Sequence, residues 1–243
     1  MSNPRVAVFR PDDGRLRETV ELLEDLGCDP LGEPLLKIEK TGDVPRSDAD
    51  YVIFTSTTGV QYVADSSWHP GESTICAIGE KTANALQEAG YPQPIIPEEH
   101  SSEGLVSMLS GKIAGVRVEI ARSSHGSDVL PSGLQRAGGY IHETILYRLT
   151  RPEGTGDAAE SAAAGNLDGI LFTSPLIIEH FLESAEEREV REEVLDELER
   201  MIVGCIGSPT RRRAEANDIS VDVVPNNAGI ENLANDVLKA IGK

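Results

Sequence analysis

Small hydroxyl side chains stand at several points where a β-rich apolar run gives way to a helical pattern. In an open parallel sheet, such strand-to-helix corners lie beyond the carboxyl ends of the strands, where helix N-termini present free N–H groups. Corners of this kind predict contacts with an anionic ligand. For any single residue, a helix N-cap explains the hydroxyl equally well. The candidate residues are Ser56, Thr57, Ser102, Ser174, Ser208 and Thr210.

Cationic side chains accompany these corners. Arg211 opens the run RRR at 211–213, Lys81 lies in AIGEKTANAL, and Arg10 and Arg122 end two similar strand patterns. Cations in the first turn of a helix oppose the helix dipole, so their presence favours a bound anion. Ion pairs with surface acids such as Glu215 explain one or two arginines equally well.

Tyr147 is the candidate for proton transfer. A phenol has an ordinary pKa of about 10, so it is protonated at neutral pH and can donate a proton to a departing oxygen. The alternative is simple packing, since Tyr147 lies in the β-rich run ILYRL.

The composition limits the classes of partner. The chain carries 41 acidic and 22 basic residues, a formal net charge of -19, which argues against nucleic acid or an anionic membrane surface as a partner. Three separated cysteines, no apolar signal core and no membrane-length apolar run predict a soluble, cytoplasmic protein. Five scattered histidines and the absence of phosphate-binding or metal-binding motifs predict that no metal or other cofactor is used.

Short apolar β-rich runs alternate with amphipathic helical patterns, which predicts an α/β fold with parallel sheets and flanking helices. The expected strands are 6–9, 51–54, 75–78, 116–120, 141–147, 169–172, 202–206 and 221–224.

Internal repetition divides the chain. The segments DYVIFTSTTGVQYV at 50–63 and CAIGEKTANAL at 76–86 resemble DGILFTSPLIIEHF at 168–181 and CIGSPTRRRAE at 205–215. A third pair, IIPEEHSSEGLVSML at 95–109 and VVPNNAGIENLANDVL at 223–238, keeps the same order, and in each a strand is expected before the proline. Two similar open parallel-sheet domains are therefore expected.

A displaced repeat predicts that the first domain is discontinuous. RVAVFRPDDG at the start resembles VRVEIARSSHG at 116–126, and EPLLKIEK at 33–40 resembles ETILYRLT at 143–150. Residues 1–36 and 151–243 would form the first domain, and 40–146 the inserted one. The crossings near 35–39 and 146–150 would form a two-stranded linker.

Taken in order, these motifs resemble the uroporphyrinogen-III synthase family over nearly the whole chain. The resemblance implies two α/β domains with the substrate held in a cleft between them. It also implies a lyase that cyclises hydroxymethylbilane to uroporphyrinogen III, with loss of water and inversion of the last pyrrole ring, in haem and porphyrin biosynthesis. No cofactor is implied, and we expect a monomer.

The resemblance also implies roles for particular residues. Tyr147 matches the family's candidate proton donor, Thr210 its second IGxxT corner, and Ser56 and Ser174 its two FTS corners. The substrate's eight carboxylates fit corners rich in N–H groups and selected arginines.

Two alternatives stay open at this point. One is a non-catalytic binding or regulatory module of the same fold, which a corner blocked by Leu176 and its bulky neighbours would favour. The other is an α/β transferase acting on a phosphorylated substrate, which a metal requirement would favour.

Overall fold

The computed structural model describes residues 3–11 and 14–242. The chain divides into two compact units, which we call the first unit (Met1–Lys37 with Thr150–Lys243) and the inserted unit (Ile38–Leu149). The domain limits expected from the sequence, 1–36 with 151–243 and 40–146, stay a prediction as limits of independently folding domains.

The inserted unit contains a sheet of four parallel strands in the order β4-β3-β5-β6. The strands are β3 (Tyr51–Phe54), β4 (Thr74–Ala77), β5 (Arg117–Ser123) and β6 (Tyr140–Thr150). Its helices are α2 (Thr57–Ala64), α3 (Glu80–Glu88), α4 (Ser102–Leu109) and α5 (Val129–Arg136).

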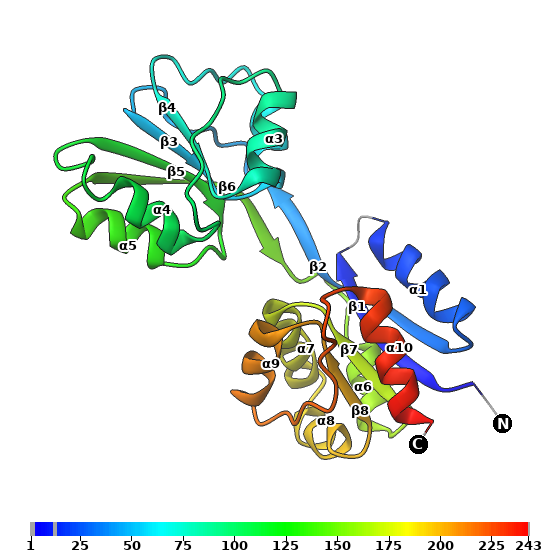
Figure 1. Cartoon of the computed structure of the whole chain (residues 1–243). Coiled ribbons are helices and arrows are strands. Elements are labelled where there is room, and N and C mark those ends of the chain that lie inside the picture. Colours follow the sequence, from blue (N-terminus) through cyan, green and yellow to red (C-terminus); the bar gives the residue numbers. More distant parts are fainter. Residues whose placement is uncertain (1–2, 12–13, 243) are drawn as a thin grey trace. The chain divides into compact units, whose positions relative to one another are not determined.

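Alternation along β3 shows why helices cover both faces of this sheet. Val52 and Phe54 pack with residues of α2 and α3, whereas Ile53 packs with residues of α4 and α5. All three side chains have no exposed surface. Successive strand residues point to opposite faces, so a run that is apolar at every position needs cover on both sides. Figure 1 shows α3 and the α4–α5 pair on the two sides of the sheet.

The first unit contains four parallel strands in the order β2-β1-β7-β8. The strands are β1 (Arg5–Pro11), β2 (Asp29–Lys40), β7 (Gly169–Phe172) and β8 (Ile202–Cys205). The helices are α1 (Arg15–Asp25), α6 (Asp157–Ala163), α7 (Pro175–Glu187), α8 (Arg191–Leu198), α9 (Ser208–Glu215) and α10 (Ile230–Ile241). The prediction of a parallel α/β fold is confirmed.

The two units have the same strand topology. In the inserted unit β6-β5-β3-β4 repeats the order β2-β1-β7-β8, and each strand corresponds to the one matched by the sequence repeats. Even the weakest element is repeated, because Ile95 pairs with β4 and Val223 with β8 through single isolated bridges.

The expected strand 221–224 is therefore wrong, as is a strand before Pro97. Each segment makes one bridge and does not form a ladder. Pro225 follows the first, and Pro94 and Pro97 flank the second. Proline has no N–H to donate, so it limits the extension of an edge strand.

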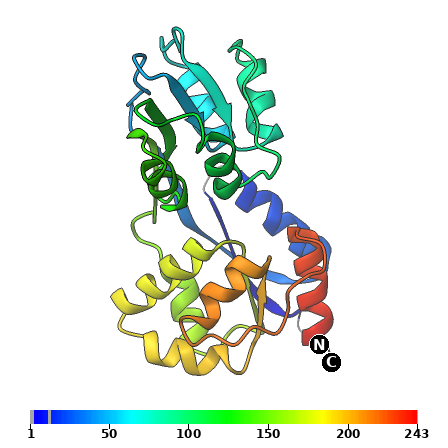
Figure 2. The ribbon, with the colours of Figure 1, turned by 60° about the vertical axis from the view of Figure 1, so that its left-hand side comes forward.

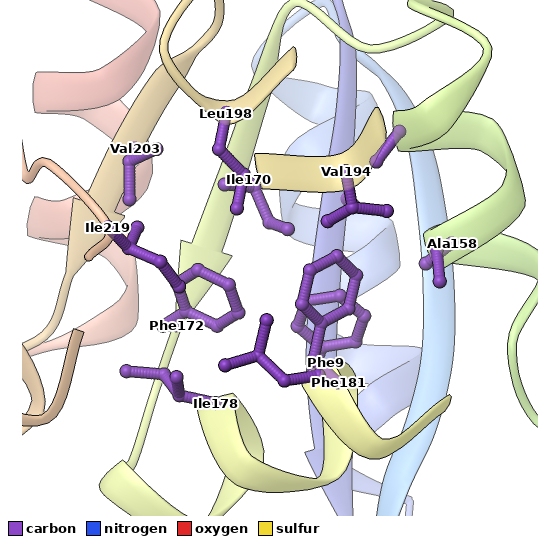
Figure 3. Packing of buried hydrophobic residues seen from close by; sticks show 14 of the residues in the cluster. Phe9, Ala158, Ile170, Phe172, Ile178, Phe181, Val194, Leu198, Val203 and Ile219 are labelled. Atoms are coloured by element: carbon purple, nitrogen blue, oxygen red, sulfur yellow. The ribbon is translucent and has the colours of Figure 1, made fainter. Parts of the chain in front are cut away.

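Opposite faces of the first unit bury different clusters. Three phenylalanines from β1, β7 and α7 form the centre of one cluster, Phe9, Phe172 and Phe181, with ring centroids 5.4–5.8 Å apart (Figure 3). On the other face α1 and α10 lie beside each other (Figure 2). Ring pairs in tilted or edge geometry stabilise a core beyond the area they bury.

Helix α6 is capped from a distant strand. The buried carboxylate of Glu33 in β2 accepts hydrogen bonds from the backbone N–H groups of Gly156, Asp157 and Ala158. The first N–H groups of a helix have no partner within the helix, so a carboxylate there satisfies them and complements the helix dipole. This contact ties the start of α6 to the strand on which the chain leaves the first unit.

We expect Glu33→Ala to lower the free energy of unfolding by about 2–3 kcal/mol, because it leaves buried N–H groups unsatisfied. Urea unfolding followed by circular dichroism measures the change. Glu24→Ala on the exposed face of α1 is the matched control and should change stability by less than about 0.5 kcal/mol. Equal effects of the two substitutions would contradict the capping role.

Candidate functional site

A cavity of about 190 Å³ lies at the carboxyl ends of β3, β4 and β5 in the inserted unit. Four of the residues singled out from the sequence line it: Ser56, Ser102, Arg122 and Tyr147. Open α/β folds bind ligands at the carboxyl ends of their parallel strands.

Ser56 and Tyr147 meet in this cavity although they are far apart in the sequence. The Tyr147 hydroxyl donates to Ser56 Oγ at 3.0 Å. Ser56 is also the N-cap of α2, since its Oγ accepts from the Gly59 N–H at 3.0 Å. A hydroxyl oxygen has two lone pairs and one proton. Because both lone pairs of Ser56 Oγ are used, its own O–H is left to donate to a ligand.

A bulge in β6 orients Tyr147. The pairing of β5 with β6 shifts between Arg122, which faces Ile145, and Ser123, which faces Tyr147. As a result Leu146 and Tyr147, adjacent in sequence, both pack into the cluster beneath α2 and α3. A bulge re-aims a side chain in this way.

The ring of Tyr147 is held by packing, with 7% of the residue exposed. The Tyr62 ring packs edge-on against it, with the two ring centroids 5.8 Å apart, and Lys40 Nζ lies 5.3 Å from the centroid of the Tyr62 ring. Thr41 fixes the neighbouring backbone, since its N–H and hydroxyl donate to the Leu146 carbonyl. The packing interpretation of Tyr147 and its polar role are therefore compatible, because the ring is buried while the hydroxyl borders the cavity.

Arg122 organises the loop that closes the cavity. Its guanidinium donates to the carbonyls of Ser123, Gly126 and Ser127, and forms an ion pair with Glu143 at 2.7 Å. Only 8% of its side chain is exposed. Its charge lies at the cavity, while its N–H groups are engaged by the protein itself.

The other candidates of the inserted unit lie at helix starts. Thr57 and Ser102 are the first residues of α2 and α4, and Lys81 is the second residue of α3. Ser101, not Ser102, caps α4 by accepting from Gly104 N–H. Ser102 is thus left to line the cavity.

The first unit repeats these corners. Ser174 caps α7 by accepting from the Ile177 N–H, Ser208 begins α9, and Thr210 is buried in the first turn of α9. Arg10 lies near the end of β1 and is partly buried. The binding roles of all these residues stay predictions.

Arg211 is used in an ion pair. Its Nε lies 2.7 Å from Glu215 Oε1, a contact that raises the pKa of the guanidinium. Arg213 pairs with Glu179 at 3.1 Å. The ion-pair interpretation of the RRR run thus describes two of its three members.

Leu176 and its neighbours do not remove the cap at the Ser174 corner. Ile177 and Ile178 are buried in the core of the first unit, and the Ser174 cap bond is intact. Leu176 itself is partly exposed and lies outside that cluster, so only its two neighbours are accounted for by core packing.

Three further lining residues have polar side chains and were not among the candidates: Thr55, Ser123 and Ser127. Thr55 begins the predicted corner, and its hydroxyl lies 3.4 Å from the Ala121 carbonyl. Ser123 and Ser127 lie in RSSHGS, whose abundance of small polar residues after a strand was the available signal.

Comparison with known proteins identifies the family. The family model of uroporphyrinogen-III synthase HemD matches residues 17–235. A proposed uroporphyrinogen-III synthase of Methanothermobacter thermautotrophicus is 33% identical over 231 residues, covering 88% of this chain and 90% of the relative. The chain belongs to the uroporphyrinogen-III synthase family.

A further relative and two solved structures of the same family name are also similar to this chain. The uroporphyrinogen-III synthase of Chlorobaculum parvum is 24% identical over 185 residues, 72% of each protein. The fold matches a mutant uroporphyrinogen III synthase of Thermus thermophilus, with a TM-score of 0.73 and 19% identity over 98% of this chain and 99% of that chain. The Helicobacter pylori enzyme matches with a TM-score of 0.60 and 14% identity over 98% and 99%. The function is that of a uroporphyrinogen-III synthase, a cyclising lyase of porphyrin and haem biosynthesis.

Within residues 3–11 and 14–242, the helices are all too short or too polar to cross a membrane. Over the same residues, no three His, Cys, Asp or Glu side chains gather as metal ligands.

The Ser56–Tyr147 contact should contribute to stability. We expect Ser56→Ala to lower the free energy of unfolding by about 2 kcal/mol, because it removes a cap and the acceptor of the partly buried Tyr147 hydroxyl. Ser101→Ala, which removes a cap and an exposed hydrogen bond to Glu99, should cost about 1 kcal/mol. A double-mutant cycle of Ser56→Ala with Tyr147→Phe, measured by urea unfolding, should give a coupling of about 1 kcal/mol. Additive effects would contradict the contact.

The three cysteines should be unreactive in the folded protein. Burial raises the pKa of Cys28 to about 11, helped by the charge of Asp29, and burial raises the pKa of Cys76 and Cys205 to about 12. The thiolate is the reactive form, so alkylation at pH 8 should be at least about 100-fold slower than in urea. Because the native thiols hold their protons more tightly, stability should fall as the pH rises above about 9. Rapid native labelling, measured by mass spectrometry, would contradict this burial.

Proposed function

We propose that the cavity at Ser56 and Tyr147 binds an acidic part of hydroxymethylbilane and that Tyr147 supplies the proton for loss of its terminal hydroxyl. The observation that carries this proposal is the 3.0 Å bond between the Tyr147 hydroxyl and Ser56 Oγ at the start of α2. A proton donor and a helix N-terminus thereby border one cavity.

The cavity suits carboxylates. The hydroxyls of Ser102 and Ser127 line it, α2 and α4 begin there, and the guanidinium of Arg122, which is paired with Glu143, borders it. N–H groups at helix starts and neutral hydroxyls bind anions. A volume of about 190 Å³ is smaller than usual for a whole drug-sized ligand. It therefore takes one acid-bearing portion of the tetrapyrrole.

The other candidates supply further carboxylate contacts in this proposal. In the inserted unit these are Thr57 and Lys81, and in the first unit they are Arg10, Ser174, Ser208, Thr210 and Arg211. The Ser174 cap bond supports this assignment, because it presents the start of α7 in the same way that Ser56 presents α2. For Arg211, binding requires exchange of Glu215 for a substrate carboxylate.

The chemistry needs a proton donor at one atom. The leaving hydroxyl takes a proton as its C–O bond breaks, and the bond's electron pair departs on water. The adjacent pyrrole nitrogen supplies electrons to the carbon and then loses its N–H proton. This proton replaces the one that Tyr147 gave up. Ser56 passes its free O–H proton to the leaving oxygen while Tyr147 replaces it. Positioned proton transfer accelerates such steps by about 10²–10⁴-fold.

Closure onto the inverted last ring needs a folded substrate conformation more than a strong nucleophile. Holding the reacting ends together converts the closure into a favourable intramolecular step. Carboxylate contacts far from the reacting carbon supply this positioning.

We further propose that the enzyme is cytoplasmic and monomeric. Its strongly acidic composition fits a small-molecule substrate and does not fit nucleic acid. A surface of this charge repels nucleic acid.

Tyr147→Phe should lower kcat about 100-fold without abolishing turnover, because the substrate contacts and the ring packing remain. The assay uses freshly generated hydroxymethylbilane, oxidation of the products and separation of isomers I and III. Tyr91→Phe is the matched control, since it removes a hydroxyl that donates to the Val63 carbonyl away from the cavity. Full activity of folded Tyr147→Phe would remove its role, and formation of isomer I alone by the unsubstituted protein would overturn the function.

A further inference from the structure

A second cavity of the inserted unit lies at the amino ends of its strands, opposite the cavity at Ser56 and Tyr147. It has a volume of about 400 Å³ and is bordered by the starts of β5 and β6 and by the loop that precedes β3. Its polar lining residues are Arg46, Asp48, Arg117, Glu119 and His142. The synthase chemistry proposed above takes place at the carboxyl ends of the strands and uses none of them.

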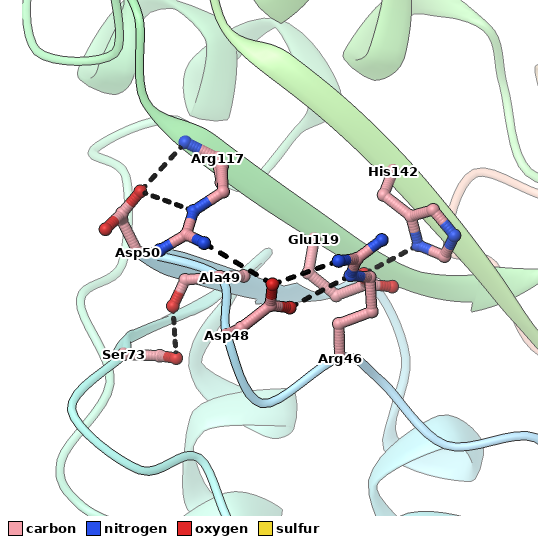
Figure 4. A network of polar contacts seen from close by, with 8 residues as sticks. All are labelled: Arg46, Asp48, Ala49, Asp50, Ser73, Arg117, Glu119 and His142. Carbon is pink, nitrogen blue, oxygen red and sulfur yellow. Dashed lines mark hydrogen bonds and ion pairs between the residues drawn. The ribbon is translucent and has the colours of Figure 1, made fainter.

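Glu119 lies at the floor of this cavity and is fully buried. One of its carboxylate oxygens, Oε2, lies 2.7 Å from Nδ1 of His142, which is its direct neighbour on β6. The other, Oε1, is buried and has no hydrogen-bond partner among residues 3–11 and 14–242. Figure 4 shows Glu119 pointing toward His142 and Arg46.

A buried carboxylate oxygen without a donor is unfavourable. Burial of a charge costs free energy unless hydrogen bonds or an opposite charge compensate it, and almost all buried polar atoms in folded proteins have partners. Oε1 therefore needs a donor that the surrounding side chains do not provide.

The two arginines of the cavity are already paired with other acids. Arg46 donates from two nitrogens to the Asp48 carboxylate, each at 2.9 Å. Arg117 lies 3.3 Å from Asp48 and 3.5 Å from Asp50. Arg46 also interacts with Glu119 through its charge. The two arginines together match only Asp48 and Asp50, so Glu119 adds one carboxylate beyond the arginine charge at the cavity.

The remaining walls are apolar. Val118, Ile141 and Tyr140 border the cavity, and Tyr140 is 69% exposed. A cavity of this size with apolar walls and one uncompensated polar group is typical of a small-molecule site. A carboxylate with a single imidazole supplies fewer protein ligands than a zinc site uses. A donor with an apolar body fits better.

We propose that this cavity binds a small organic monocation, whose N–H group donates to Glu119 Oε1 and whose apolar part packs on Val118, Ile141 and Tyr140. The half-exposed side chains of Arg46 and His142 border its entrance. Binding of the cation neutralises the uncompensated carboxylate, so charge and hydrogen bonding give the site its selectivity.

Benzylammonium chloride is the probe, and benzyl alcohol and phenylacetate are its neutral and anionic counterparts. Each is titrated at constant ionic strength into the full-length ¹⁵N-labelled protein, followed by amide chemical shifts. We expect saturable shifts with benzylammonium that are confined to 46–50, 117–119 and 140–142. Benzyl alcohol should bind at least about 10-fold more weakly, because it lacks the charge, and phenylacetate should not bind.

Glu119→Gln keeps the side-chain volume and removes the charge, so it should weaken benzylammonium binding at least about 10-fold. Glu88→Gln, which removes an exposed charge of α3 outside the cavity, should change it less than about two-fold. Equal binding to Glu119→Gln and the unsubstituted protein would overturn the proposal. So would equal binding of benzyl alcohol, or the absence of saturable shifts, both of which are measured on the unsubstituted protein.

Discussion

The parallel pairing of β5 with both β3 and β6 is the constraint from which the chemistry of the inserted unit follows. It places the carboxyl ends of all three strands on the same side of the sheet, and the Ser56 corner and Tyr147 lie there. Their hydrogen bond joins residues 91 positions apart. The same pairing collects the amino ends on the opposite side, where Glu119 and His142 become direct neighbours. One arrangement of strands thus creates two chemically distinct cavities.

Cations are scarce in this chain, and the structure uses most of those near the corners for its own contacts. Arg122 closes a loop by binding three carbonyls, Arg211 pairs with Glu215, and Arg213 pairs with Glu179. In the function proposed above, anion binding therefore depends mainly on backbone N–H groups at helix starts, whose partial charges are fixed by the fold. Salt screens the general repulsion between an acidic surface and a polyanionic substrate, while dipoles in contact with the substrate are screened less.

The duplicated topology shows how one design is adapted twice. Both units use serine caps after the strands β3 and β7, and both keep a single bridge at the next edge. They differ where the polar contacts differ. In the inserted unit the equivalent of β2 carries Tyr147, whereas in the first unit β2 carries Glu33, which caps α6. Matched backbones thus place unrelated side chains at corresponding strands, one bordering a cavity and one stabilising a helix.

The sequence by itself determined the α/β class, the corners and the matched halves, because periodicity, turn residues and repetition are local properties of the chain. It also located Tyr147 and Ser56 separately. Only the tertiary structure decided that they touch, because the β6 bulge that turns Tyr147 onto the face of Leu146 breaks the alternation from which a side chain's direction is predicted. The sequence also showed no sign that Arg122 and Arg211 are used in internal contacts, or that one oxygen of Glu119 has no partner within the part of the chain that the structure describes. Each depends on which distant side chains surround a group, and that is set by strand pairing and register.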